Sequence, residues 1–284
     1  MKQMGKGQLG QRTVIVTGAA SGIGAALATR LFLNGHNVVA CDINEAGIDI
    51  PRPASQPVGR MIRRRLDVRS RTDWDNAIAQ TVGEFGGIDV CCNIAGYLKV
   101  TTIEEMTDTD IDNHIDINVK GVMLGTQAAA VAMIRQGGGH IINMSSLAGL
   151  APPPGLALYS GSKFAVRGFS LATAIELRKR GIALTVIYPD AVQTPMLDVQ
   201  LDHPGAALTF SGSKALTTDD VVTAIVDHVM VNQPLELGLP RSREALARLA
   251  GVAPRLSVVL DPLLTRIGLR NQAKARAAAR LRGR

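Results

Sequence analysis

The chain has 284 residues, a hydrophobic fraction of 46%, an aromatic fraction of 3% and a net charge of +7. This length suits one α/β domain and is short for two. No uninterrupted apolar run of about 18 residues is present and Met1–Gln11 lacks an apolar segment, so we expect neither a transmembrane helix nor a secretory signal. Cys41, Cys91 and Cys92 fall in predicted strands, so we expect buried reduced thiols, no metal site and a cytoplasmic protein.

A strand, a glycine-rich turn and a helix are predicted first along the chain. Residues 12–17 form a β-branched run, residues 18–24 contain three glycines, and residues 25–34 have apolar side chains at helical spacing. Glycines let the backbone approach a pyrophosphate, and a helix N-terminus offers free N–H groups. We therefore expect dinucleotide phosphates to bind at Gly18, Ser21, Gly22, Ile23 and Gly24.

A second strand is predicted over residues 37–41, and it ends in Asp42, 24 residues after Gly18. A carboxylate at this place accepts hydrogen bonds from the adenosine ribose hydroxyls and repels a 2′-phosphate, which favours NAD over NADP. The alternative is that Asp42 only caps the following turn.

The segment that leads to the third strand is proline-rich and then basic. Three prolines between residues 51 and 57 argue against a regular helix over residues 45–59, where we expect a surface loop or a short, broken helix. The arginines in residues 60–65 precede Leu66-Asp67-Val68, and we interpret them mainly as the solvated face of strand three.

Tyr159 and Lys163 lie four residues apart, and Ser146 lies thirteen positions before the tyrosine. On a helix this spacing puts the phenol and the ammonium on one face. A nearby ammonium favours the phenolate and lowers the tyrosine pKa, so the pair is a candidate proton donor and acceptor. Taken alone, it is also an ordinary exposed helical pair.

These motifs together resemble the short-chain dehydrogenase/reductase superfamily, in its form with one Rossmann domain, from Gly10 to Met230. Thr17–Gly24 is similar to the family's T-G-x-x-x-G-x-G cofactor loop, and Asp67-Val68 to the pair that contacts adenine. Residues 93–96 resemble its N-N-A-G motif, with Ile94 in place of the second Asn. The resemblance implies that the turn residues bind the cofactor together with Asp42, Asp67, Val68, Asn93, Ala95, Gly96, Tyr159, Lys163, Pro189, Val192 and Thr194.

Asn118, Ser146, Tyr159 and Lys163 match the family's catalytic tetrad. The resemblance implies that Tyr159 exchanges a proton with a substrate hydroxyl while hydride moves to or from the nicotinamide. It also implies that Lys163 binds the nicotinamide ribose and, with the nicotinamide charge, lowers the Tyr159 pKa. Ser146 would orient the substrate oxygen, and Asn118 would keep a water in line with Lys163.

One turn departs from the family pattern. After the predicted strand at residues 184–188 the family has Pro-Gly, and this chain has Pro189-Asp190. Asp tolerates a left-handed backbone, so we expect the turn to be kept. Its carboxylate near the mouth of the site could repel acidic substrates.

The predicted substrate contacts are mostly apolar: Ser146, Leu147, Tyr159, Met196 and Leu197. An apolar wall around one reacting polar group suits a lipophilic secondary alcohol or its ketone, although core packing is the alternative for each leucine. Residues 195–217 are predicted to form a mobile lid.

Residues 239–284 carry eleven Lys or Arg and two acidic residues, so their net charge is +9 and that of residues 1–238 is −2. We expect a catalytic domain over 10–238 and a basic, partly amphipathic helical extension over 239–284, with helices at 242–250 and 256–269, the second interrupted by Pro262. The extension could cover the substrate pocket or a neighbouring subunit, or touch an anionic membrane weakly. Nucleic-acid binding is disfavoured because no aromatic side chains interleave with the basic ones.

Short apolar strands alternating with helical stretches predict a Rossmann-type doubly wound parallel sheet of about seven strands with helices on both faces. The predicted function is NAD(H)-dependent interconversion of a secondary alcohol and its ketone. The alternatives are an NADPH-dependent carbonyl reductase and a non-catalytic NAD-binding scaffold, which would be expected to lack part of the tetrad. The resemblance also implies a homo-oligomer that packs through residues 113–132 and 159–178.

Overall fold

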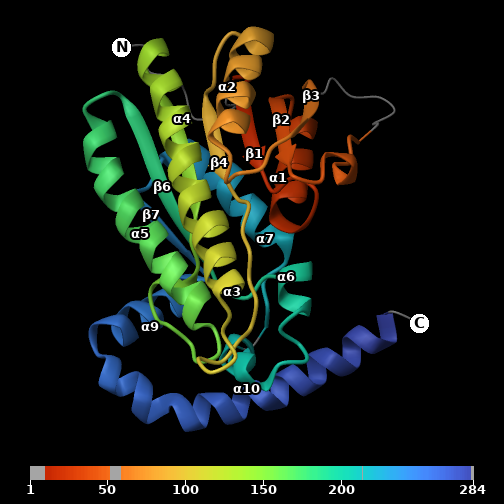
Figure 1. Ribbon diagram of the computed structural model, residues 1–284, viewed down its shortest axis with the longest axis vertical. Helices are drawn as coiled ribbons and strands as arrows, with labels where there is room; N and C mark the ends of the chain where they lie inside the picture. The colour runs from red at the N-terminus through yellow and green to blue at the C-terminus, as the bar shows by residue number, and fades with distance from the viewer. Residues whose placement is uncertain (1–9, 52–58, 213, 283–284) are drawn as a thin grey trace.

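The computed structural model describes residues 10–51, 59–212 and 214–282, which form a seven-stranded parallel sheet (Figure 1). Its strand order is β3-β2-β1-β4-β5-β6-β7, so the chain runs outward from β1 in one direction and from β4 in the other. The predicted Rossmann-type sheet is confirmed. The strands are β1 (Thr13–Thr17), β2 (Asn37–Asp42), β3 (Met61–Arg65), β4 (Val90–Asn93), β5 (Gly139–Met144), β6 (Ile182–Pro189) and β7 (Glu236–Leu239).

Helices cover both faces of the sheet, as Figure 1 shows. One core joins the sheet to α1 (Gly22–Leu33), α7 (Thr218–Thr223) and the π-helical segment Ala224–Val229. The other joins it to α2 (Arg71–Phe85), α4 (Gly121–Gln136) and α5 (Ala157–Arg178). The remaining helical segments are η1 (Glu45–Gly47), α3 (Asp108–Asn113), the π-helical His114–Lys120, η3 (Leu147–Gly149), α6 (Pro195–Asp198), η4 (Pro204–Phe210), α8 (Met230–Asn232), α9 (Arg241–Val252) and α10 (Pro254–Arg282).

The helical run Asp108–Gln136 is long and apolar enough to cross a membrane by composition alone. However, 56% of its most apolar window is buried within the structure, as in the core helices of globular domains. We therefore assign this run to the helical layer of the fold.

The cysteines illustrate the alternation of side chains along the parallel strands. Cys91 contributes to the core under α2 and α4, and its neighbour Cys92 to the core under α1. Both thiols and that of Cys41 are buried and free, and burial raises the pKa of Cys92 to about 12. The expectation of buried reduced thiols is confirmed.

The proline-rich segment forms only a short helix within its described part. Asn44 begins η1 by accepting the Gly47 N–H through its side chain at 3.2 Å. Residues 52–58 lie outside the described residues, so the expected short, broken helix is confirmed only at the start of the segment. Most of Met1–Gln11 also lies outside the described residues.

The C-terminal extension consists of α9 and α10. Unlike the prediction, α10 continues through Pro262. The proline removes one N–H, which costs one helical hydrogen bond. Side chains beyond Pro262 bind the body of the protein, and these contacts hold the part of the helix after the proline.

Helix α10 lies across the end of the molecule where the strands finish and contacts the predicted lid (Figure 1). Gln272, which is buried, donates from Nε2 to the carbonyls of Gln200 and His203, both at 2.8 Å. Asn271 Nδ2 donates to the Phe210 carbonyl at 3.0 Å. The described part of the lid is thus attached to the extension by its main chain, which the sequence did not indicate.

A buried polar cluster joins the centre of the sheet to α4 and α5. Asn143 Nδ2 donates to Ser170 Oγ at 2.8 Å and to Thr126 Oγ1 at 3.1 Å, and Asn93 Nδ2 donates to Asn143 Oδ1 at 2.8 Å. All four side chains are almost fully buried. Asn143 therefore satisfies polar groups from three other elements.

Replacing Asn143 with Ala should lower the free energy of unfolding by about 2–4 kcal/mol, because a buried donor on Asn93 and a buried acceptor on Ser170 lose their partner. The measurement is the midpoint of urea unfolding. Asn113→Ala, at the end of α3, is the control and should leave the midpoint unchanged. An Asn143→Ala midpoint equal to that of the wild type would show that the cluster contributes nothing.

Candidate active site

A cavity of about 720 Å³ opens at the carboxyl ends of the strands, where parallel α/β sheets bind ligands. Most of the residues predicted for the site line it. They are Gly18, Ser21, Gly22, Ile23, Gly24, Asp42, Asp67, Val68, Ala95, Gly96, Ser146, Leu147, Tyr159, Lys163, Pro189, Val192, Thr194, Met196 and Leu197. The two predicted residues outside this lining are Asn93 and Asn118.

Asn93 belongs to the buried cluster around Asn143 and does not reach the cavity. Its position at the end of β4 places the next residues, Ala95 and Gly96, at the cavity wall. The Asn93 side chain therefore supports the sheet, and its predicted contact with the cofactor stays a prediction.

The glycine-rich turn has the shape that a dinucleotide phosphate site requires. Gly18 and Gly22 have φ of 72° and 55°, in the left-handed region that favours glycine. A Cβ at Gly18 would lie 2.9 Å from the Ala95 Cα, and one at Gly22 would lie 3.2 Å from Thr194 Cγ2. The turn leads directly into the N-terminus of α1, whose first N–H groups lack helical partners. The residues present therefore fit a dinucleotide.

Asp42 caps the turn after β2 and also lines the cavity, and its predicted contact with a ribose stays a prediction. Its Oδ1 accepts the Asn44 N–H at 2.9 Å and so caps the following turn. Its Oδ2 accepts the Ala20 N–H at 3.0 Å, which ties the carboxylate to the glycine-rich turn while it lines the cavity. Each carboxylate oxygen keeps a further lone pair for a ligand hydroxyl.

Arg69 also lines the cavity, close to Asp67, and was not predicted. Its Nε and Nη2 donate to Asp67 Oδ1 and Oδ2 at 2.9 and 2.7 Å. This guanidinium lowers the pKa of the Asp67 carboxyl, mainly through the hydrogen bonds between them. Adjacency to Asp67-Val68 was the only sequence signal for this residue. The Arg69 guanidinium therefore forms its ion pair with Asp67.

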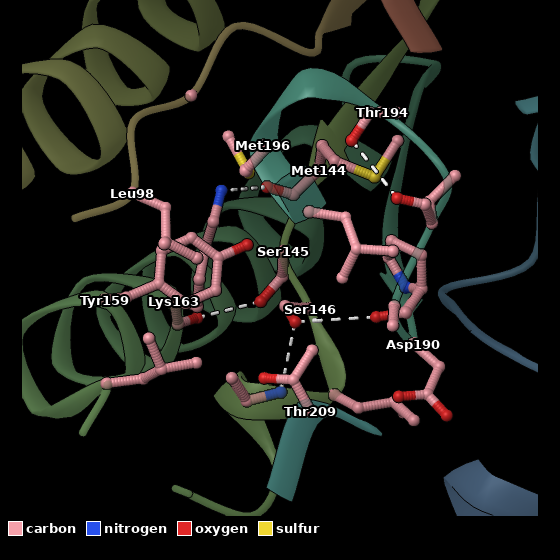
Figure 2. Close-up of a pocket in the computed structure, with 18 of the residues that line it drawn as sticks. Leu98, Met144, Ser145, Ser146, Tyr159, Lys163, Asp190, Thr194, Met196 and Thr209 are labelled. Carbon is pink, nitrogen blue, oxygen red and sulfur yellow. Dashed lines mark hydrogen bonds between the residues drawn. The ribbon is translucent and has the colours of Figure 1, made fainter. Parts of the chain in front are cut away.

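Tyr159 and Lys163 share one face of α5, as predicted, and both are buried (Figure 2). Lys163 Nζ lies 5.5 Å from the centre of the Tyr159 ring and donates to the Met144 carbonyl at 3.0 Å. Burial raises the pKa of Tyr159 to about 12, and the Ser146 hydroxyl offsets this only in part. Burial also lowers the pKa of Lys163 to about 8. Within the polypeptide, desolvation therefore outweighs the expected lowering of the tyrosine pKa.

Ser146 stands opposite this face, in the segment after β5 (Figure 2). Its Oγ donates to the Pro189 carbonyl at 3.4 Å and accepts the Ala148 N–H at 3.1 Å. These two contacts orient the hydroxyl toward the cavity that Tyr159 lines.

Asn118 lies in the π-helical segment and is fully buried behind the cavity. Its Oδ1 accepts the Tyr97 N–H at 2.7 Å, and its Nδ2 donates to the Tyr97 carbonyl and to Ser162 Oγ, both at 2.9 Å. Asn118 therefore holds the segment after β4 against α5. The predicted water contact stays a prediction.

Asp190 does not present a free carboxylate to the cavity. Arg243 of α9 donates from Nε to Asp190 Oδ2 at 2.8 Å, and from Nη2 to Ser211 Oγ at 3.3 Å. The expectation that Asp190 repels acidic substrates is therefore wrong, because a residue 53 positions away neutralises it.

The apolar wall of the cavity extends beyond the predicted Leu147, Met196 and Leu197. The extension adds leucines and alanines from α9 and α10, which confirms that it covers the pocket. These residues are Leu246, Ala247, Leu249, Ala250, Leu260 and Leu264. The leucine spacing was visible in the sequence, but the direction of the helices was not.

Replacing Arg243 with Leu should lower the free energy of unfolding by about 1–2 kcal/mol. The ion pair of Arg243 and Asp190 is half-buried, and such a pair contributes more to stability than a fully exposed pair and costs less to break than a fully buried one. A second change, Asp190→Gly, removes the charge left unpaired. The double variant should therefore be more stable than Arg243→Leu alone in thermal unfolding. Equal stability of Arg243→Leu and the wild type would contradict this role.

Known proteins share both the sequence and the fold. The family model for short chain dehydrogenases matches residues 12–204. The 2,5-dichloro-2,5-cyclohexadiene-1,4-diol dehydrogenase LinX of Sphingobium indicum is 36% identical over 190 residues, which are 66% of this chain and 76% of that protein. A 3-alpha-(or 20-beta)-hydroxysteroid dehydrogenase of Mycobacterium tuberculosis is 37% identical over 193 residues, 68% of this chain and 73% of that protein.

The crystal structure of a short chain dehydrogenase from Mycobacterium paratuberculosis bound to NAD superposes with a TM-score of 0.71 and 26% identity. The superposition covers 84% of the present chain and 100% of the chain in that crystal structure. The family model matches more than half of the chain, in a range that contains the glycine-rich turn and the helix with Tyr159 and Lys163. The chain belongs to the short chain dehydrogenase family.

Proposed function

We propose that this protein is an NAD(H)-dependent oxidoreductase that interconverts a lipophilic secondary alcohol and its ketone. The observation that carries the proposal is the arrangement of Tyr159, Lys163 and Ser146 at one cavity with the glycine-rich turn and Asp42. The catalytic domain is residues 10–238, and residues 239–284 are its extension.

When bound, the nicotinamide accepts or supplies the hydride. Tyr159 takes the proton of the substrate hydroxyl in oxidation and returns it in reduction. Ser146 holds the substrate oxygen, since its hydroxyl is oriented by two main-chain contacts. Lys163 holds positive charge beside the phenol and binds the ribose, while Asn118 keeps the Tyr97 segment and α5 in place.

The preference for NAD rests on the adenosine end of the cavity. The Asp42 carboxylate is fixed there by Ala20 and Asn44 and would repel a 2′-phosphate. Arg69, a basic residue nearby, is paired with Asp67. The related dehydrogenase of M. paratuberculosis, which is described as bound to NAD, supports the same cofactor.

The substrate class rests on the apolar lining. Leucines from α9 and α10 and the side chains of Leu147 and Met196 line the cavity into which Ser146 and Tyr159 face. The names of the two relatives give a cyclic diol and a hydroxysteroid as substrates, and both carry secondary hydroxyls on a ring. An alicyclic secondary alcohol is therefore the class to screen first.

We also propose that the protein is cytoplasmic and forms a homo-oligomer through α4 and α5. Large apolar side chains are exposed on both helices, among them Met123, Ile134, Phe164 and Ile175. A non-catalytic scaffold is disfavoured, because all four tetrad residues are present and three of them line the cavity.

Tyr159→Phe should lower kcat by about 10²–10⁴-fold while the Kd for NAD stays within about twofold, because the change removes only the proton donor and acceptor. The assay follows nicotinamide absorbance with alicyclic secondary alcohols. Tyr97→Phe, at another tyrosine that lines the cavity, is the matched control and should keep most of its activity. Normal turnover by Tyr159→Phe would exclude the assigned mechanism.

NAD should raise the thermal unfolding temperature more than NADP at equal concentration, because tighter binding stabilises the folded state more. Asp42→Ala should narrow this difference, since the repulsion of a 2′-phosphate is removed. A wild-type protein that binds NADP more tightly would favour the carbonyl reductase alternative.

A further inference from the structure

The junction of α9 and α10 exposes a group of large apolar side chains, here called the apolar corner. Val252 is 85% exposed, and Val258 and Val259 are each 74% exposed. The other members, also exposed, are Leu246, Leu249 and Leu263. The junction lies at one end of the molecule (Figure 1). Six such residues within 18 positions form a patch of a kind that marks interaction sites.

The apolar corner is continuous with the wall of the active-site cavity. Leu246 and Leu249 line the cavity and are nevertheless 61% and 55% exposed. The same side chains therefore form the inner wall and the outer rim of the pocket. A lipophilic molecule would meet apolar surface all the way from the outside to the site.

Basic residues accompany the apolar corner along α10. Arg255, Arg266, Arg270 and Lys274 are exposed, and within the described part of the chain no carboxylate lies at ion-pair distance from them. Val259, Leu263, Arg266 and Arg270 follow a spacing of three and four residues, so they share one helix face. That face is directed away from Gly268 and Gln272, which are buried against the lid.

The combination of apolar and basic side chains on this face of α10 indicates which kind of partner it can bind. A second copy docked face to face would bring the same four cations together without acidic residues to receive them. A nucleic acid would meet the cations but leave the valines and leucines unburied. An anionic lipid surface receives both, since apolar side chains enter the acyl boundary and the cations meet lipid phosphates and carboxylates.

We propose that the apolar corner, with the basic face of α10, docks the protein on the surface of an anionic membrane. Docking directs the rim of the cavity at Leu246 and Leu249 toward the lipid. It needs neither cofactor nor substrate, so it can be tested separately from the proposed reaction.

The test is flotation of the full-length protein with vesicles at low salt. The protein should bind vesicles that contain about 30% phosphatidylserine, bind phosphatidylcholine vesicles much less, and be released at about 0.5 M salt. The double variant Val258→Asp with Val259→Asp should bind at least about tenfold more weakly. Arg266→Glu with Arg270→Glu should remove the preference for the anionic lipid.

The matched control is Val231→Asp, at a valine that is 53% exposed on α8 and lies outside the extension, and it should bind like the wild type. Val258 and Val259 do not line the cavity, so their double variant should keep the wild-type circular dichroism spectrum and activity on a water-soluble alcohol.

Failure of the wild type to bind anionic vesicles, or equal binding by the Val258 and Val259 variant, would overturn the proposal. So would a wild-type oligomer, measured by light scattering, that this variant dissociates while vesicles are not bound, because the corner would then be a contact between copies. Absence of dehydrogenase activity in a protein that still binds vesicles would count against the proposed function alone.

Discussion

The burial of the Lys163 ammonium is the constraint on which the site depends. A charge removed from water needs hydrogen-bond acceptors, and the Met144 carbonyl at the end of β5 provides one at 3.0 Å. This contact fixes α5 over the ends of the central strands and brings Tyr159, one turn earlier, to the segment that carries Ser146.

The C-terminal extension is as much a part of the site as the Rossmann domain. Arg248 ties α9 to the sheet edge, because it pairs with Glu236 of β7 at 3.3 Å and, within the helix, with Glu244 at 2.8 Å. Arg243 then reaches the turn after β6, and the leucines of both helices close the cavity. The family model ends at residue 204, so this roof is built by residues outside the shared pattern.

The sequence could predict the features that depend on residues close together in the chain. The strand, glycine turn and helix around Gly18–Gly24, and the Tyr-Lys pair on α5, are each specified within a few residues, and the structure has them as expected. Arg243 could not be predicted, because its partner Asp190 is 53 positions away and only the tertiary fold joins them. The role of Asn93 was missed for the same reason, since the motif did not show that Asn143 and Thr126 occupy its amide. Pro262 suggested a helix end that tertiary contacts override.

The hydrogen bonds between α10 and the lid have a consequence for how this enzyme can change. Besides an ion pair between Arg276 and the Asp202 carboxylate, the side chains of Gln272, Asn271 and Arg276 bind main-chain carbonyls of the lid. Every amino acid supplies a main-chain carbonyl, so substitutions within residues 200–210 leave these bonds in place. The surface that faces the substrate can therefore acquire new side chains while the lid keeps its position. Attachment through the main chain separates the evolution of selectivity from the maintenance of the fold.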